Sequence, residues 1–114
     1  MIMTKIVYAP FPYLDEQNSR NRPLLVLAEN QDEYETIIVA YITSKMGKKI
    51  LESDFVLSSN DEFFEKTGLN KDFIIRLHKL GCIQKSTIQF EVGNLPKNAT
   101  LEIRKKLKNL LNLN

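Results

Sequence analysis

Four side chains at the ends of apolar segments could carry out chemistry on a phosphate group: Arg22, Thr43, Arg76 and His78. Guanidinium groups bind phosphate through two parallel hydrogen bonds, hydroxyls donate to phosphate oxygens, and an imidazole moves a proton near neutral pH. Such a set suits attack on a phosphodiester of RNA, because the 2′-OH is a built-in nucleophile and the reaction then needs no metal. RNA cleavage is therefore one hypothesis for these residues.

Each of the four also has an ordinary structural interpretation. Arg22 could be a surface arginine ahead of a strand, and Thr43 is a good strand former. Arg76 could be an exposed cross-strand ion-pair partner, and a single strand histidine such as His78 is more often structural than catalytic. The chemical interpretation requires that the fold bring these side chains together.

The apolar segments predict the elements that would position them. A short acidic turn predicts that the second and third strands form an antiparallel hairpin, which brings Arg22 near Thr43. Arg76 and His78, two residues apart on one strand face, would lie about 7 Å from each other. Strands are expected at 5–11, 24–28, 36–43, 54–57, 72–80 and 88–93, with 24–28 central because it is apolar on both faces. A single helical turn or two should end at Gly68, before the fifth of these strands.

A C-terminal helix should follow, capped by Asn98 or Thr100. Its apolar stripe is predicted to consist of Ile103, Leu107, Leu110 and Leu111. The pattern indicates a single domain over 1–114, mainly β with helices, built as a small antiparallel barrel or a strongly coiled sheet.

Composition and charge narrow the class of protein. The chain has 114 residues, of which 43% are hydrophobic and 26% charged, as in ordinary globular domains. Its net charge of +2 is too small to indicate a nucleic-acid partner by itself. No apolar run approaches the roughly 18 residues that span a bilayer, so we expect a soluble cytoplasmic protein.

The single cysteine and the single histidine limit which cofactors the chain could bind. Cys82 cannot form an internal disulfide, which fits a reducing compartment, and it is expected to be a small core residue. A lone His78 nearly excludes a histidine-based zinc site, since zinc takes about three or four N or S ligands. We therefore predict no metal and no cofactor.

Three stretches resemble the MazF/PemK toxins, the endoribonucleases of type II toxin–antitoxin systems. They read IVYAPFPY at 6–13, RPLLVL at 22–27 and ITSK at 42–45, and shorter similarities continue to Leu95. The resemblance covers nearly the whole chain, and the order and spacing of its pieces make it fairly specific. It implies an SH3-like barrel of the CcdB/MazF/PemK type with a C-terminal α-helix, a homodimer, cleavage of single-stranded RNA, and an antitoxin partner.

The resemblance also implies roles for particular residues. Arg22 and Thr43 match the central catalytic pair, and Arg76 matches an arginine that some members use. Two positions later those members have an acidic residue where this chain has His78, which becomes the candidate proton-transfer group. The predicted substrate-binding residues are Phe11, Ser19, Arg20, Asn21, Ser44, Lys45 and Arg76.

Two functions stay open at this point. Arg22 with Thr43 favours a sequence-specific, metal-independent ribonuclease toxin that acts on messenger RNA. The weak net charge, and Thr4-Lys5 where the family usually has Gly-Asp, leave room for a non-catalytic or degenerate member. Such a protein would be an RNA- or protein-binding module, including one that inhibits gyrase as CcdB does. In the toxin hypothesis an acidic antitoxin segment would bind across the loops 14–21 and 44–49.

Overall fold

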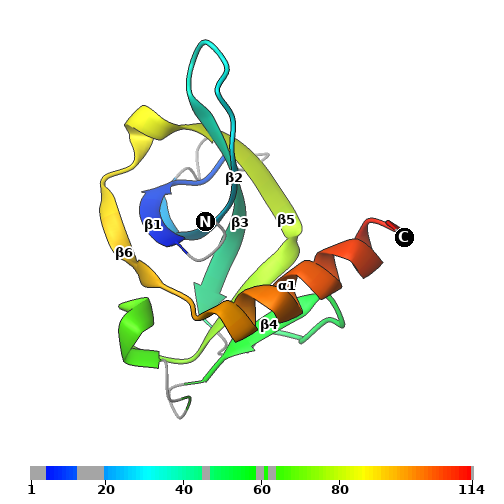
Figure 1. Cartoon of the computed structure of the whole chain (residues 1–114). Helices are drawn as coiled ribbons and strands as arrows, with labels where there is room; N and C mark the ends of the chain where they lie inside the picture. Colours follow the sequence, from blue (N-terminus) through cyan, green and yellow to red (C-terminus); the bar gives the residue numbers. More distant parts are fainter. Residues whose placement is uncertain (1–4, 13–19, 45–46, 59–60, 62–63, 114) are drawn as a thin grey trace.

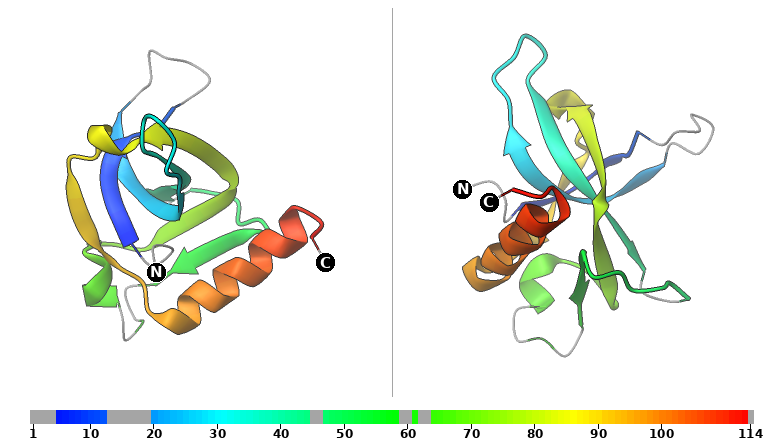
Figure 2. Two further views of the ribbon diagram at one scale, coloured as in Figure 1. Left: turned by 45° about the horizontal axis from the view of Figure 1, so that its top comes forward. Right: turned by 90° about the vertical axis from the view of Figure 1, so that its right-hand side faces the viewer.

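One curled antiparallel sheet and one helix make up the fold. The computed structural model describes residues 5–12, 20–44, 47–58, 61 and 64–113. Six strands are hydrogen-bonded in the order β4-β5-β3-β2-β1-β6. The strands are β1 (Lys5–Pro10), β2 (Asn21–Glu29), β3 (Thr36–Ser44), β4 (Asp54–Leu57), β5 (Phe73–Gln84) and β6 (Phe90–Asn94). The sheet curls into a half-barrel, and the helix α1 (Lys97–Leu110) lies along β4 at one side (Figures 1 and 2).

The sheet buries apolar residues on both of its faces, which explains why β2 is apolar throughout. One core cluster includes Ile6, Leu25, Ile42 and Ile75, and it is completed by Ile103 of α1. The other cluster, on the opposite face, consists of Val7, Ala9, Phe11, Leu24, Val26, Ile37, Val39, Tyr41 and Ile83. Consecutive strand residues alternate between the two clusters, as the period of two requires. The predicted central position of the second strand is confirmed, because β2 lies between β3 and β1.

The hairpin of β2 and β3 projects beyond the rest of the sheet (Figure 2). Its turn is closed by Asp32, whose carboxylate accepts hydrogen bonds at 2.9 Å from the backbone N–H and from the hydroxyl of Thr36. The backbone hydrogen bond from Thr36, and then the hydroxyl, lower the pKa of Asp32 from its ordinary value. Local hydrogen bonds therefore fix the turn that sets the β2–β3 register.

A bulge in β5 shapes the surface beside this hairpin. Ala40 pairs with Leu80, but the next residue of β3, Tyr41, pairs with Arg76. The three residues between Arg76 and Leu80 therefore have no counterpart on β3, and His78 and Lys79 belong to this extra stretch.

Close packing continues just beyond the bulge. A Cβ atom built at Gly81 would lie 2.8 Å from Cγ of Pro12 and 3.3 Å from Cε1 of Phe11, so the end of the β1 segment packs directly on β5 there. A side chain at position 81 would push these two segments apart.

Several predicted boundaries differ from the observed ones. The fifth strand continues to Gln84, because its second half pairs with β3 along the projecting hairpin. The 3₁₀ turn η4 (Lys85–Thr87) delays β6 until Phe90, and a second one, η3 (Phe64–Thr67), precedes Gly68 as expected. Gly68 has a φ of +74°, the left-handed conformation that favours glycine at the end of a helical turn.

Three predictions about single residues were wrong. Pro96, rather than Asn98 or Thr100, occupies the position before α1, and the hydroxyl of Thr100 donates back to the Pro96 carbonyl at 3.0 Å. Leu111 lies beyond the last helical turn and is 50% exposed instead of belonging to the apolar stripe. Cys82 is exposed, because its neighbour Ile83 takes the inward position of the alternating strand.

Candidate active site

Arg22 lies near the start of β2 with its guanidinium over an aromatic ring. Its Cζ atom is 5.0 Å from the centroid of the Tyr41 ring, in a cation–π contact. Its Nε is buried and finds no hydrogen-bond partner among the residues that the structure describes. Pro23, paired with Tyr8 of β1, stiffens the backbone beside it. Arg22 thus packs on Tyr41, while its buried Nε donor has no partner in the described part of the protein.

Tyr41 links Arg22 to the bulge in β5. The Nζ atom of Lys79 lies 5.1 Å from the centroid of the same ring, and Phe11 meets the ring edge-on at a centroid distance of 5.1 Å. Phe11 and Tyr41 both belong to the second core cluster. At the edge of that cluster, the Tyr41 ring therefore contacts two cationic groups and packs on Phe11.

Thr43 follows Tyr41 by two residues on β3 and is 5% exposed. The β2–β3 ladder ends at the pair of Leu24 with Tyr41, so Arg22 and Thr43 each lie two residues beyond its last pair. Residues two apart on a strand share a face, so Thr43 belongs to the same face as Tyr41. The predicted hairpin of β2 and β3 is observed, and Arg22 contacts β3 through Tyr41.

Arg76 and His78 meet at a carboxylate from another strand. Asp54, the first residue of β4, is the register partner of Arg76 and its side chain is 0% exposed. Its Oδ2 accepts a hydrogen bond from Nη2 of Arg76 at 3.1 Å, and the same nitrogen donates to the Lys49 carbonyl at 3.0 Å. Nδ1 of His78 lies 3.9 Å from the other carboxylate oxygen of Asp54. The prediction that Arg76 and His78 lie together is confirmed.

Arg76 is a cross-strand ion-pair partner, as its structural interpretation proposed, but its pair with Asp54 is buried and not exposed. The Arg76 side chain is only 12% accessible to solvent. Burial makes this pair part of the framework of the site, because a buried charge requires a partner.

The environment of His78 favours its neutral form. Partial burial is the main cause that lowers the pKa of its imidazole, and the nearby charges of Arg76 and Lys79 lower it further. The carboxylate of Asp54 acts in the opposite direction but does not outweigh them. A neutral imidazole at pH 7 can accept a proton, as a general base must.

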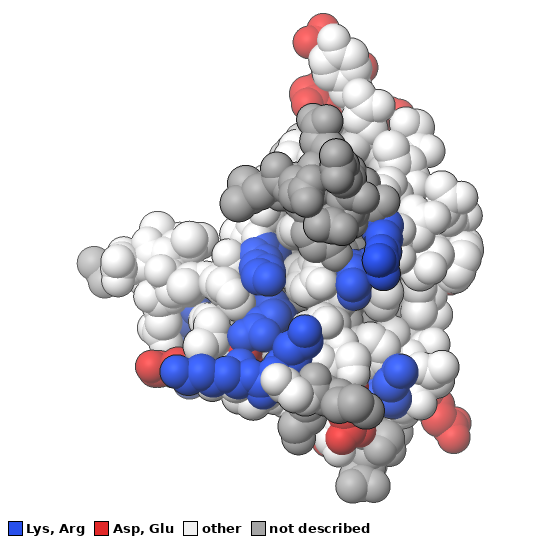
Figure 3. Space-filling model, turned by 180° about the vertical axis from the view of Figure 1, so that it is seen from behind, with Lys and Arg blue, Asp and Glu red and all other residues white. Residues whose placement is uncertain are grey.

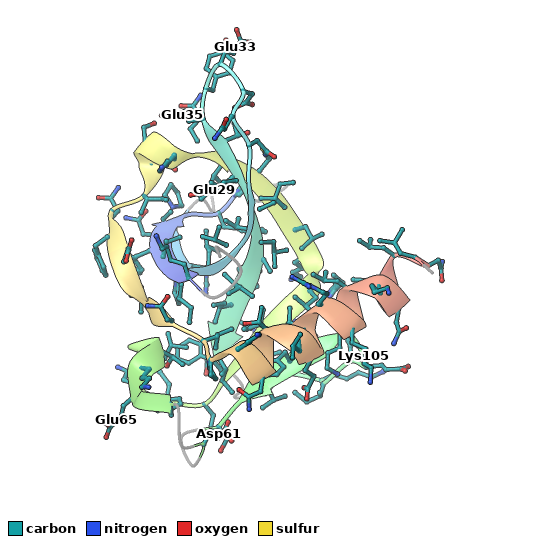
Figure 4. All side chains as sticks on the ribbon, viewed as in Figure 1. Glu29, Glu33, Glu35, Asp61, Glu65 and Lys105 are labelled. Carbon is teal, nitrogen blue, oxygen red and sulfur yellow. The ribbon has the colours of Figure 1, made fainter. Side chains whose placement is uncertain are left out.

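The charges at this site are predominantly positive. The site holds three positive charges, from Arg22, Lys79 and Arg76, and one negative charge, from Asp54. The net charge of these four side chains is therefore +2. Lys and Arg side chains gather over the middle of one face of the molecule, and most of the acidic residues visible there lie at its margins (Figure 3). Glu33 and Glu35 lie on the projecting hairpin, and Asp61 and Glu65 lie at the opposite end of the protein (Figure 4). Such a distribution attracts an anionic ligand.

The predicted substrate-binding residues occupy different settings. Arg20 and Asn21 are exposed at the start of β2, and Ser44 is half-buried at the end of β3. Phe11 is 6% exposed and belongs to the core cluster that borders the site. Ser19 and Lys45 lie outside the described residues.

Three residues of this site escaped the sequence analysis: Tyr41, Asp54 and Lys79. Tyr41 could have been found from its position two residues before Thr43 on the same strand face. Asp54 offers a weaker signal, a carboxylate that opens an otherwise apolar strand. Lys79 depends on the bulge, for which the sequence offers no signal that we recognise.

Among the residues with described structure, no group of three His, Cys, Asp or Glu side chains is arranged to hold a metal ion. None of the helices in that part of the chain is long and apolar enough to cross a membrane.

Comparison with known proteins gives matches to one family. The model of a family described as "PemK-like, MazF-like toxin of type II toxin-antitoxin system" matches residues 3–111. A sequence search of curated proteins gave no match.

Solved structures share the fold at low sequence identity. The toxin MazF-mt6 of Mycobacterium tuberculosis superposes with a TM-score of 0.70 at 15% identity, covering 95% of this chain and 98% of its own. An endoribonuclease in complex with its cognate antitoxin, from a mycobacterial species, gives 0.72 at 11% identity and covers 100% and 97% of the two chains. MazF from Deinococcus radiodurans gives 0.66 at 15%, with coverages of 96% and 94%. The expected mainly β fold with a C-terminal helix is thereby confirmed.

Proposed function

The chain belongs to the PemK-like, MazF-like toxin family of type II toxin–antitoxin systems, and on this premise we propose that it is a metal-independent, sequence-specific endoribonuclease. The observation that carries the proposal is the Arg22 guanidinium, which contacts the same Tyr41 ring as Lys79 and whose buried Nε has no hydrogen-bond partner among the described residues. A phosphodiester is the ligand that such a cluster fits best, because it supplies negative charge and acceptor oxygens together.

The proposed reaction is a transesterification within the RNA strand. The 2′-oxygen attacks the neighbouring phosphorus while its proton passes to His78, and the bond between phosphorus and the 5′-oxygen breaks. The 5′-oxygen leaves with a proton taken from water, and the resulting hydroxide takes the proton from His78, which restores the neutral imidazole. The products are a 2′,3′-cyclic phosphate and a 5′-OH, so every atom comes from the RNA or from water.

Arg22 is proposed to stabilise the negative charge that develops on the phosphorane, since a guanidinium is too basic to accept protons easily. Thr43 would donate to a non-bridging oxygen or orient Arg22. Lys79 adds a second cation at Tyr41. Arg76 contributes its positive charge to the site. Its Nη2 already donates to Asp54 and to the Lys49 carbonyl, so a direct phosphate contact would have to use its other donors.

Substrate recognition is proposed to extend to both sides of this centre. Arg20 and Asn21 on one side, and Ser44 on the other, are described residues that could contact the RNA. Ser19 and Lys45 remain in the proposed set on the sequence argument alone.

The direct test is incubation of the purified protein with a long single-stranded RNA in the presence of EDTA, followed by mapping of the new ends. We expect cleavage at a short recurring sequence, with ends that polynucleotide kinase can phosphorylate without prior phosphatase treatment, as a 5′-OH requires. Intact RNA at micromolar protein would reject the ribonuclease proposal. It would favour the non-catalytic alternative, which a gyrase inhibition assay then examines.

An acidic antitoxin segment is the proposed protein partner. One structural neighbour of this chain is an endoribonuclease in complex with its cognate antitoxin. Carboxylates of such a segment could mimic the phosphates of RNA at Arg20, Arg22, Lys48 and Lys49, in addition to Lys45.

We also propose that the protein is a homodimer, because apolar side chains stay exposed on α1 and just after it. Leu111 and Leu113 after α1 are 50% and 58% exposed, and Leu101 on α1 is 55% exposed. Burying them against a second copy would add to the modest core of a domain of this size.

Light scattering should therefore give twice the chain mass at tens of micromolar protein, roughly the range in which a specific interface holds. The control is the same measurement on a Leu111→Glu/Leu113→Glu variant, in which a dimer held by these residues should dissociate. A wild-type monomer under these conditions would contradict the proposal.

A further inference from the structure

The buried carboxylate of Asp54 has an oxygen whose role the proposed mechanism leaves open. Asp54 lies on the edge strand β4 with a side chain that is 0% exposed. Its Oδ2 is well satisfied by the Leu51 backbone N–H at 2.7 Å and by Nη2 of Arg76 at 3.1 Å. Its Oδ1 is also buried but has no hydrogen-bond partner among the described residues. A buried acceptor without a partner is rare and requires an explanation.

One candidate donor is His78. Its Nδ1 lies 3.9 Å from this oxygen, which is longer than a hydrogen bond. The His78 side chain is 31% exposed and lies in the β5 bulge, where the strand is free of the ladder to β3. Closing the gap by about 1 Å would produce an ordinary N–H···O bond.

We propose that Asp54 is a positioning residue for His78, an inference that rests on the ribonuclease function proposed above. In the closed arrangement, Oδ1 of Asp54 accepts a hydrogen bond from the Nδ1–H of the neutral imidazole. This fixes the tautomer in which Nε2 carries a lone pair, and Nε2 takes the proton of the 2′-OH. His78 is then the general base of the reaction, and Asp54 acts only through it.

The charges around His78 agree with this assignment. The groups facing it are Asp54 from β4 and Arg76 and Lys79 from β5, with the Lys49 carbonyl from the preceding loop bound to Arg76. Partial burial and the two cations lower the pKa of the imidazole, so it is neutral at pH 7. Neutrality is required twice here, for the Nε2 lone pair and for the base function.

The first test is nitrogen NMR of the imidazole in the free protein. His78 is the only histidine of the chain, so its ring signals need no assignment. We expect the wild-type protein at pH 7.5 to carry the ring proton mainly on Nδ1. The Asp54→Asn variant should lose this preference and show a lower imidazole pKa, because the carboxylate that raises it is gone.

A matched control is available in Asp61→Asn. The Oδ2 of Asp61 accepts the backbone N–H of Ser58 at 2.9 Å, three residues earlier, just as Asp54 accepts that of Leu51. This variant should leave the tautomer and the imidazole pKa of His78 unchanged. If Asp54→Asn does not fold, the tautomer of the wild-type protein decides the question alone.

The second test is the pH dependence of kcat/KM on an RNA that the protein cleaves. Asp54→Asn should lower the plateau by about ten- to a hundredfold, within what a positioned base contributes, and move the acid limb to lower pH. A merely structural role would lower the folded fraction without moving the limb. A wild-type ring proton on Nε2, or an acid limb unmoved in Asp54→Asn, would overturn the inference. If the tautomer is as expected but no RNA is cleaved, the proposed function fails while the coupling of Asp54 to His78 stands.

Discussion

Replacing Arg22 by alanine should lower kcat/KM for RNA cleavage by roughly a hundred- to a thousandfold. This is the usual effect of removing one preorganised donor from developing negative charge, about 3–4 kcal/mol of transition-state stabilisation. The structure contributes the reason for preorganisation, because Arg22 lies on the Tyr41 ring and no described residue accepts a hydrogen bond from its buried Nε. The measurement is the initial rate on a short RNA that contains the mapped cleavage site.

The same substitution should leave the fold intact. A cation–π contact of this kind contributes only about 0.5–2 kcal/mol. Arg22→Lys should retain part of the activity, since the charge stays but the planar fork is lost. The control is Arg104→Ala, which removes one positive charge from an exposed position on α1. Cleavage by Arg22→Ala at the wild-type rate would show that the site has been assigned to the wrong residues.

The placement of Arg22 against β3 was predictable because it depends on local features. The turn between β2 and β3 is short and acidic, and Asp32 closes it through hydrogen bonds to Thr36, only four residues away. A short turn fixes the hairpin register, and the register then sets which residues face one another. The local residue pattern also predicted β4 with its observed bounds, Asp54–Leu57.

The positions of Asp54 and Lys79 in the site could not be predicted from the sequence, because they depend on contacts between distant segments. Asp54 meets Arg76 across 22 residues of sequence. Lys79 reaches Tyr41 only because β5 bulges, and the packing of Pro12 on Gly81 lies just beyond that bulge. Sequence periodicity indicates which face a residue belongs to, but a bulge changes that face partway along the strand. The residues that the sequence analysis missed are therefore those next to or across from the bulge.

Arg76→Met should be the most destabilising change in the site. It leaves the Asp54 carboxylate, whose side chain is fully buried, without its counter-charge. Breaking a buried pair in this way costs about 3–5 kcal/mol, a large part of the roughly 5–15 kcal/mol that stabilise a small domain. We expect the midpoint of thermal unfolding to fall by more than about 10 °C. Urea unfolding at one fixed protein concentration measures the free energy itself.

Two further variants test whether the unpaired buried charge of Asp54 causes the loss of stability in Arg76→Met. Asp54→Asn/Arg76→Met removes both charges but keeps an acceptor for the Leu51 N–H, so it should recover more than half of the lost free energy of unfolding. Lys5→Met breaks an ion pair of similar length, 3.0 Å to Glu91, whose side chains are 38% and 61% exposed. That variant should cost less than about 1 kcal/mol.

The stability of Arg76→Met also decides how its activity can be interpreted. If the variant unfolds near the assay temperature, lost cleavage reflects lost protein, and rates must be divided by the folded fraction. A contribution of Arg76 to phosphate binding would then appear as a deficit of the double variant relative to Asp54→Asn alone, because both lack the carboxylate and only the double variant lacks the cation. An Arg76→Met protein within about 1 kcal/mol of wild type would instead mean that the Asp54 carboxylate finds water or another partner. In that case burial does not fix the position of the Asp54 carboxylate, and its effect on the tautomer of His78 would need another explanation.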